Sequence, residues 1–198
     1  MRRIGPGQNH ITKLMARIFT TLAVFIILSL TATIVVGFVS LSLGPAHKDI
    51  FLALSTLHFY LGLGTTLVIL LVHCIIFTYF LGTGRWVKEV GLAYQLPDEH
   101  LPKLTRELKR WTFPPALFAM LIAIATVAAG AGAQLQEWPW LVHAVLAFLT
   151  LFINILAFRV EWRNLRTNAQ VIQEVLTQVD RIRAARGLPD NADALRHS

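Results

Sequence analysis

Long apolar runs, separated by short polar or charged segments, dominate the chain. Four of the runs contain no Asp, Glu, Lys or Arg, and they extend over Ile18–Ala46, Ile50–Gly84, Trp111–Gln136 and Trp138–Phe158. A helix needs about 20 apolar residues to cross the hydrocarbon core of a bilayer. The pattern therefore predicts four transmembrane helices, with spans of about 18–43, 50–82, 114–134 and 138–158.

The composition supports a membrane protein. Hydrophobic residues make up 55% of the 198 residues and charged residues only 15%, compared with about 25% charged residues in ordinary soluble domains. Four spans leave no room for a separate soluble domain. We expect an all-α, polytopic membrane protein in which residues 1–158 form a four-helix transmembrane bundle and residues 159–198 form a cytoplasmic amphipathic helix and tail.

The positive charges lie on alternate connections. Four Lys or Arg precede the first run, six lie between Arg85 and Arg110, and seven lie between Arg159 and Arg196, whereas the other two connections hold only Lys48. The positive-inside rule then predicts a multi-pass protein of the inner or plasma membrane with both termini in the cytoplasm. The net charge of +7 is thus explained by topology and attraction to anionic lipid, so nucleic acid is not an expected partner.

The middle segment 85–110 is predicted to be a cytoplasmic loop. A short helix over residues 98–109 would place Leu101, Leu104 and Leu108 on one face, which we expect to lie on the membrane, on the tail or on a partner protein. The next span is rich in Ala and Gly, which favours close helix packing, and Pro114 and Pro115 are expected in its first turn.

The segment after the fourth run keeps helical spacing. Its apolar residues recur every three or four positions: Leu165, Ala169, Ile172, Leu176, Val179 and Ile182. A stripe of this kind must be buried against another element. We favour a continuous extension of the fourth helix that packs on the middle loop, and pairing with the same segment of a second copy is the alternative.

Three histidines lie inside the apolar runs: His58, His73 and His143. Ionisable side chains within a membrane are rare and are usually functional. The second and fourth helices are both predicted to begin at the outer face, so His58 and His143 should lie at similar depth. Two imidazoles on facing helices can bind the iron of haem b from opposite sides. The sequence therefore predicts a haem b site near the outer face and an electron-transfer subunit that exchanges electrons with a membrane quinol or an outer donor.

Small residues would provide room for a porphyrin at this depth. Gly37, Gly62 and Gly130 are the candidates, each on a different helix, and Gly64 and Gly132 lie towards the same end. The competing interpretation is that His58 and His143 bond to each other or to threonines without a cofactor. The chain would then be a cofactor-free membrane scaffold or accessory subunit that forms homo-oligomers through small-residue helix faces and the C-terminal helix.

His73 has no histidine level with it on the fourth helix, because that position is Phe158. Asn154 lies on the His143 face, about 16 Å deeper than His143. His73 is therefore expected to hydrogen-bond to Asn154. The alternatives are that it is the single histidine ligand of a five-coordinate haem or that it contacts a partner subunit. No nucleophile motif, phosphate loop or CxxC is visible, and the predicted spans contain no Asp or Glu, so an enzyme or an ion-coupled transporter is not favoured.

Overall fold

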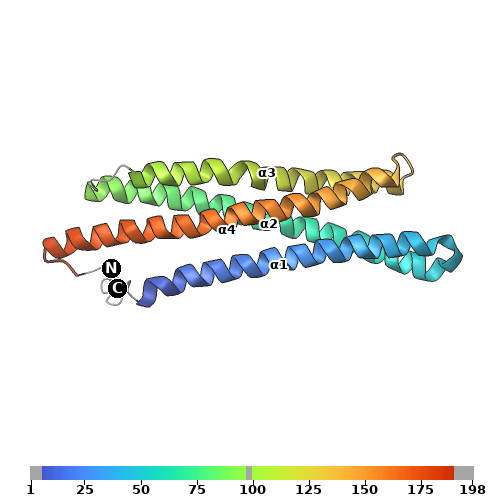
Figure 1. Ribbon diagram of the computed structural model, residues 1–198, viewed down its shortest axis with the longest axis horizontal. Helices are drawn as coiled ribbons and strands as arrows, with labels where there is room; N and C mark the ends of the chain where they lie inside the picture. The colour runs from blue at the N-terminus through green and yellow to red at the C-terminus, as the bar shows by residue number, and fades with distance from the viewer. Residues whose placement is uncertain (1–5, 97–99, 190–198) are drawn as a thin grey trace.

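The chain forms long antiparallel α-helices. The computed structural model describes residues 6–96 and 100–189, and within these ranges it contains no strand. Helix α1 covers Pro6–Leu43, a short 3-10 helix η1 covers Gly44–His47, and α2, α3 and α4 cover Lys48–Tyr94, His100–Gln134 and Trp140–Ala185 (Figure 1). In this part of the chain, four helices are long and apolar enough to cross a membrane. The predicted all-α fold with four helices of membrane-spanning length is confirmed.

The helices are arranged as two hairpins, α1 with α2 and α3 with α4. The start of α1, the end of α2, the start of α3 and the end of α4 lie at one end of the bundle (Figure 1). We call this the basic end, because Arg17, Arg85, Arg110 and Arg159 mark the first cations met there on each helix. The opposite end carries the two hairpin turns and is called the turn end. Helices α2 and α4 consequently run parallel to each other.

The helices are longer than the apolar runs. With 47 residues in α2 and 46 in α4, each measures about 70 Å, more than twice the thickness of the hydrocarbon core. The segment 85–110 is therefore mostly helical rather than a loop, because α2 continues to Tyr94 and α3 begins at His100. Residues 98 and 99, which the sequence assigned to the start of a separate surface helix, lie outside the described residues.

The two prolines of α3 lie inside the helix and not in its first turn, contrary to the sequence-based expectation. A proline inside a helix leaves the carbonyl four residues before it without its partner. For Pro114 and Pro115 these carbonyls belong to Arg110 and Trp111, whose side chains are exposed. Water or lipid headgroups at the polar boundary can satisfy the two carbonyls, so the helix continues through the prolines.

The extension of α4 packs on the ends of α2 and α3. Helix α4 runs past Arg159 without a break, and its residues Val171, Val175 and Val179 share an apolar cluster with Val87 and Leu101. The favoured prediction of a continuous extension that packs within the same chain is confirmed.

Burial along this extension differs in part from the predicted stripe. Of its members, Leu165, Ala169 and Val179 are buried, whereas Ile172, Leu176 and Ile182 are half-buried. The leucine face of α3 is also directed into the protein, with Leu101 and Leu108 buried and Leu104 packed against the same cluster. Residues 190–198 of the predicted tail lie outside the described part.

Large buried hydrophobic side chains are concentrated towards the basic end. The main cluster includes Phe19, Ile26, Leu30, Ile69, Val72, Ile76, Phe80 and Phe158. Towards the turn end, the buried side chains of the described residues are small or polar: Thr33, Ser40, Thr65, Ala129 and Thr150. The bundle therefore has a well-filled apolar core in one half and a sparsely filled interior in the other.

Candidate functional site: a histidine pair and a buried polar network

His58 on α2 and His143 on α4 approach each other in the sparsely filled half of the bundle. Their ring centroids are 5.8 Å apart and their ring planes are nearly perpendicular, at 87°. Both helices begin at the turn end, but His58 lies ten residues after the start of α2 and His143 three residues after the start of α4. The two side chains reach the same level because α2 begins about 10 Å further towards the turn end than α4. The predicted pairing of these histidines is confirmed.

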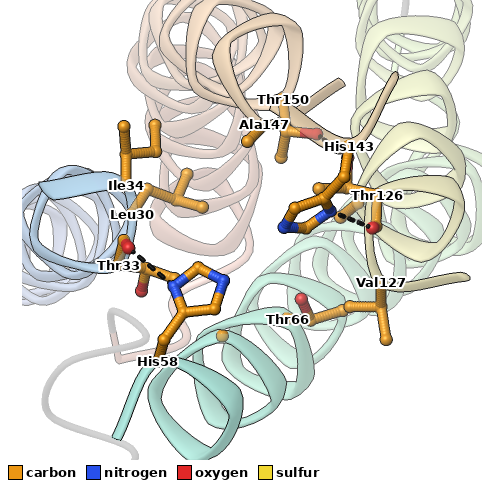
Figure 2. Close-up of a pocket in the computed structure, with 12 residues that line it drawn as sticks. Leu30, Thr33, Ile34, His58, Thr66, Thr126, Val127, His143, Ala147 and Thr150 are labelled. Atoms are coloured by element: carbon orange, nitrogen blue, oxygen red, sulfur yellow. Dashed lines mark hydrogen bonds between the residues drawn. The ribbon is translucent and has the colours of Figure 1, made fainter. Parts of the chain in front are cut away.

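Each imidazole is anchored to the backbone of the neighbouring helix. The Nδ1 atom of His58 lies 2.9 Å from the carbonyl oxygen of Thr33, and that of His143 lies 2.9 Å from the carbonyl oxygen of Thr126. Because a carbonyl oxygen only accepts, Nδ1 carries the proton in both rings, and Nε2 keeps its lone pair in the neutral imidazole. Figure 2 shows both free nitrogens directed into the space between the helices. This tautomer and anchoring are those of metal-binding histidines.

Two glycines allow this close approach. A Cβ atom on Gly37 would lie 2.7 Å from Cε1 of His58, and a Cβ atom on Gly130 would lie 2.9 Å from Cε1 of His143. Real Cβ atoms do not approach other atoms so closely, so each imidazole needs a glycine in front of it. The sequence-based expectation was that these glycines leave room for a porphyrin, whereas in the described conformation they receive the imidazoles.

A small cavity lies between the two rings. Its volume is about 70 Å³, and Gly62, Thr66 and Leu30 contribute to its lining together with the two histidines. This volume holds about two water molecules. A porphyrin needs several times more space, so its entry would require α1 and α3, or their side chains, to move outwards. Of the other two glycines noted in the sequence, Gly64 faces open space and Gly132 packs against the Trp138 ring.

The two hairpins carry matching residues at matching positions. In each hairpin, one helix carries a Thr and, four residues later, a Gly. The facing helix carries a His, which is followed by a Leu after three residues, by a small residue after four and by a Thr after seven. The first set is Thr33, Gly37, His58, Leu61, Gly62 and Thr65, and the second is Thr126, Gly130, His143, Leu146, Ala147 and Thr150. The site thus receives one imidazole from each of two similar halves. This repeat is visible in the sequence but was not part of the sequence-based prediction.

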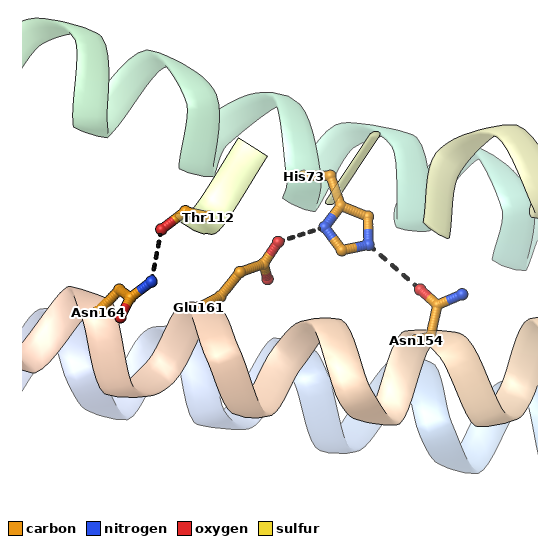
Figure 3. Close-up of polar contacts among 5 residues, drawn as sticks. All are labelled: His73, Thr112, Asn154, Glu161 and Asn164. Carbon is orange, nitrogen blue, oxygen red and sulfur yellow. Dashed lines mark hydrogen bonds and ion pairs between the residues drawn. The ribbon is translucent and has the colours of Figure 1, made fainter. Parts of the chain in front are cut away.

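His73 belongs to a second, fully buried polar network nearer the basic end. Its Nδ1 lies 2.6 Å from Oε1 of Glu161, and its Nε2 lies 3.2 Å from Oδ1 of Asn154 (Figure 3). The predicted hydrogen bond to Asn154 is confirmed. Since both ring nitrogens are engaged, neither is free to bind a metal in this conformation. His73 and His58 are separated by about 22 Å along α2.

Glu161 is the residue that sequence reasoning missed. The fourth apolar run ends at Phe158, so Glu161 was placed in the cytoplasm, yet it is completely buried in the bundle. It lies seven residues after Asn154, which is two turns further on the same face of α4, and this spacing was the available signal. The predicted spans themselves contain no Asp or Glu, but Glu161, three residues beyond the fourth span, is buried in the bundle.

Comparison of the chain with protein-family models, with curated proteins and with solved structures gives no match. Within the described ranges, no group of three or more His, Cys, Asp or Glu side chains is placed to hold a metal ion. Any function of the histidine pair must accordingly be inferred from its own geometry.

Proposed function

We propose that the chain is an integral membrane protein that binds haem b between His58 and His143 and transfers electrons near the outer face of the membrane. His58 and His143 would hold the haem iron, and the haem would supply one-electron chemistry at this site. With both histidines bound to the iron, electron transfer would be favoured over the binding or activation of oxygen.

The arrangement of the two rings carries this proposal. A metal bound to imidazole at about 2 Å on each side sets the ring centroids roughly 6 Å apart, close to the observed 5.8 Å. Both free Nε2 atoms face the same gap, and each ring is held from behind by a carbonyl oxygen. Such outer bonds fix ring orientation and raise the basicity of the ligand nitrogen.

The sparse interior around the pair supports the same function. Elsewhere in the bundle the space between the helices is filled by side chains such as Phe80 and Phe158, whereas the cavity at His58 and His143 is lined mainly by Gly, Ala and Thr residues, together with Leu30, Ile34 and Val127. Membrane bundles place cofactors between facing helices in this way. Haem b would enlarge this cavity and pack between the helices once α1 and α3, or their side chains, had moved outwards.

The position of the pair defines the expected electron partner. With the topology predicted by the positive charges, the turn end faces outwards, so the haem would accept electrons from a membrane quinol or from a donor on the outer side. The described interior offers no second histidine pair about 22 Å deeper, where His73 faces Phe158. The proposed electron transfer is therefore confined to the outer half.

A visible spectrum of the purified protein tests the proposal. After expression with ample haem we expect a Soret band and about one haem per chain. His58→Ala and His143→Ala should each lose most of it. His47→Ala is the matched control, because this residue lies at the turn end outside the pair, and it should keep the wild-type haem content.

Two outcomes would contradict haem binding: a colourless wild-type protein, or unchanged haem content in both alanine variants. A colourless but folded protein would instead favour the cofactor-free membrane scaffold that the sequence also allows. Size-exclusion chromatography of the same samples would then report whether the chain forms homo-oligomers.

A further inference from the structure

The hydrogen bonds of His73 fix how many protons its network holds. Asn154 Nδ2 donates to the carbonyl oxygen of Thr150 at 2.9 Å, so its Oδ1 is the atom that faces His73 and can only accept. Nε2 of His73 must therefore carry a hydrogen. The 2.6 Å contact between Nδ1 and Glu161 Oε1 requires one more proton, bound either to the nitrogen or to the oxygen. In both cases the pair as a whole is neutral.

The surroundings provide no other charge to the pair. Phe19 of α1 packs its ring against Phe158, and Ile76 of α2 belongs to the same apolar cluster. On α3, the buried hydroxyl of Thr112 accepts a hydrogen bond from Asn164 at 2.9 Å. Among the described residues, the only ion pair that Glu161 forms is with His73. Loss of the shared proton would leave an uncompensated negative charge in an apolar interior.

Among the described residues, α4 carries three buried acceptors without a hydrogen-bond partner, the third being Gln178 Oε1; one belongs to the pair and one lies about 10 Å further along the helix. Glu161 Oε2 and Asn168 Oδ1 are buried and have no hydrogen-bond partner. They are seven residues apart on one face of the helix, and the direction from Glu161 to Asn168 leads to the basic end. Nδ2 of Asn168 donates a hydrogen bond to the hydroxyl oxygen of Thr83 at 2.9 Å. In the same region, Tyr79 is the titratable residue of α2. Buried acceptors without protein partners usually bind water.

We propose that His73 and Glu161 form a proton-binding site that exchanges one proton with water at the basic end of the bundle. In the loaded state the proton lies between Nδ1 and Oε1. On release it passes to water near Glu161 Oε2 and Asn168 Oδ1, and the pair is left as a carboxylate beside a neutral imidazole. This proposal does not depend on haem binding, because it rests on residues about 22 Å from His58.

Infrared spectroscopy of the full chain in lipid vesicles tests the site directly. We expect a pH-dependent change in the carboxyl bands that shifts when glutamate is labelled with carbon-13: an exchange between acid and carboxylate bands if the shared proton lies on Oε1, and a shift of the carboxylate bands if it lies on Nδ1. The bands should be lost in Glu161→Gln, which preserves side-chain shape. They should persist in Glu137→Gln, the matched control in the exposed turn between α3 and α4.

A second measurement keeps the test decisive if Glu161→Gln does not fold. In wild-type protein labelled with nitrogen-15 histidine, the Nδ1 resonance of His73 should change with pH in parallel with the infrared bands. Bands and a resonance that stay constant over the full pH range in which the protein remains folded would overturn the proposal.

The direction of exchange can be tested separately. After a rapid pH change, Asn168→Leu should slow the infrared response of Glu161 severalfold, because it removes the acceptor on the basic side. Thr150→Val alters the polar chain on the opposite side of His73 and should leave the rate unchanged. The reverse result, with only Thr150→Val slowing the response, would contradict proton entry from the basic end.

Discussion

The ring of His73 stacks on the ring of Phe158, with centroids 5.2 Å apart and planes inclined by 16°. These residues are 85 positions apart, as are His58 and His143, and the hydrogen-bonded pair Thr83 and Asn168 has the same separation. Helices α2 and α4 thus pack in parallel with a constant register over most of the bundle. Phe158 occupies the position in α4 that corresponds to His73 in α2, so the level nearer the turn end has two histidines and the level nearer the basic end has one.

The glycines that face the histidines should be intolerant of a methyl group. Gly37→Ala and Gly130→Ala each place Cβ within 3 Å of an imidazole and must displace it. Such overpacking costs about 1–3 kcal/mol. We expect lower thermal stability and, with haem supplied, reduced haem content.

Gly64→Ala is the control for these variants, because nothing lies within 4 Å of its Cβ position. It should leave haem content unchanged and keep or slightly raise stability, since alanine is the better helix former. Equal losses in all three variants would show that the effect is not specific to the contacts with the imidazoles.

Removing one member of the buried pair should cost more than removing both. His73→Leu leaves the Glu161 carboxyl group buried without its partner, and we expect a loss of about 3–5 kcal/mol in the free energy of unfolding. The double variant with Glu161→Met replaces both groups by apolar side chains and should recover most of that loss. Unfolding in a denaturing detergent series measures all the variants.

The exposed ion pair between Arg85 and Glu89 supplies the comparison for the buried pair. Its side chains are 82% and 60% exposed, so Glu89→Gln should produce no measurable change in stability. A double variant as unstable as His73→Leu alone would contradict the role of the uncompensated carboxyl group.

A buried and an exposed phenylalanine of α4 should differ in their contribution to stability. Phe158 is 4% exposed and contacts both His73 and Phe19, so Phe158→Ala opens a cavity in the core and should cost roughly 3 kcal/mol. Phe152 is 59% exposed on the surface expected to face lipid, and Phe152→Ala should have little effect. Similar midpoints in thermal unfolding for the two variants would argue against the described packing of α4.

Accessibility to a membrane-impermeant thiol reagent should report the topology. Cys74 is the only cysteine, so Cys74→Ser gives a cysteine-free background. In intact cells, Glu137→Cys in the turn between α3 and α4 should be labelled. Lys103→Cys near the start of α3 should be labelled only after permeabilisation, because the positive charges are predicted to keep that end inside. The opposite pattern would reverse the predicted orientation and place the histidine pair at the inner face.

The chain sequence by itself determined the helical class, the four apolar spans and the common level of His58 and His143. These features depend on the length of apolar runs and on the constant rise of a helix, and both can be read residue by residue. The bond between His73 and Asn154 followed from the same periodicity. The matching Thr, Gly and His positions of the two hairpins were also present in the sequence.

Only the tertiary structure decided how the helices turn their faces towards one another and where they end. Helix α2 continues past Arg85 because backbone hydrogen bonding does not require apolar side chains, and packing among Val87, Leu101 and Val175 stabilises the extension. Glu161 is buried because it meets His73 on a helix 88 residues away in the chain. A charged residue just beyond an apolar run appears solvent-exposed in a sequence, and only a partner supplied by another helix makes its burial favourable.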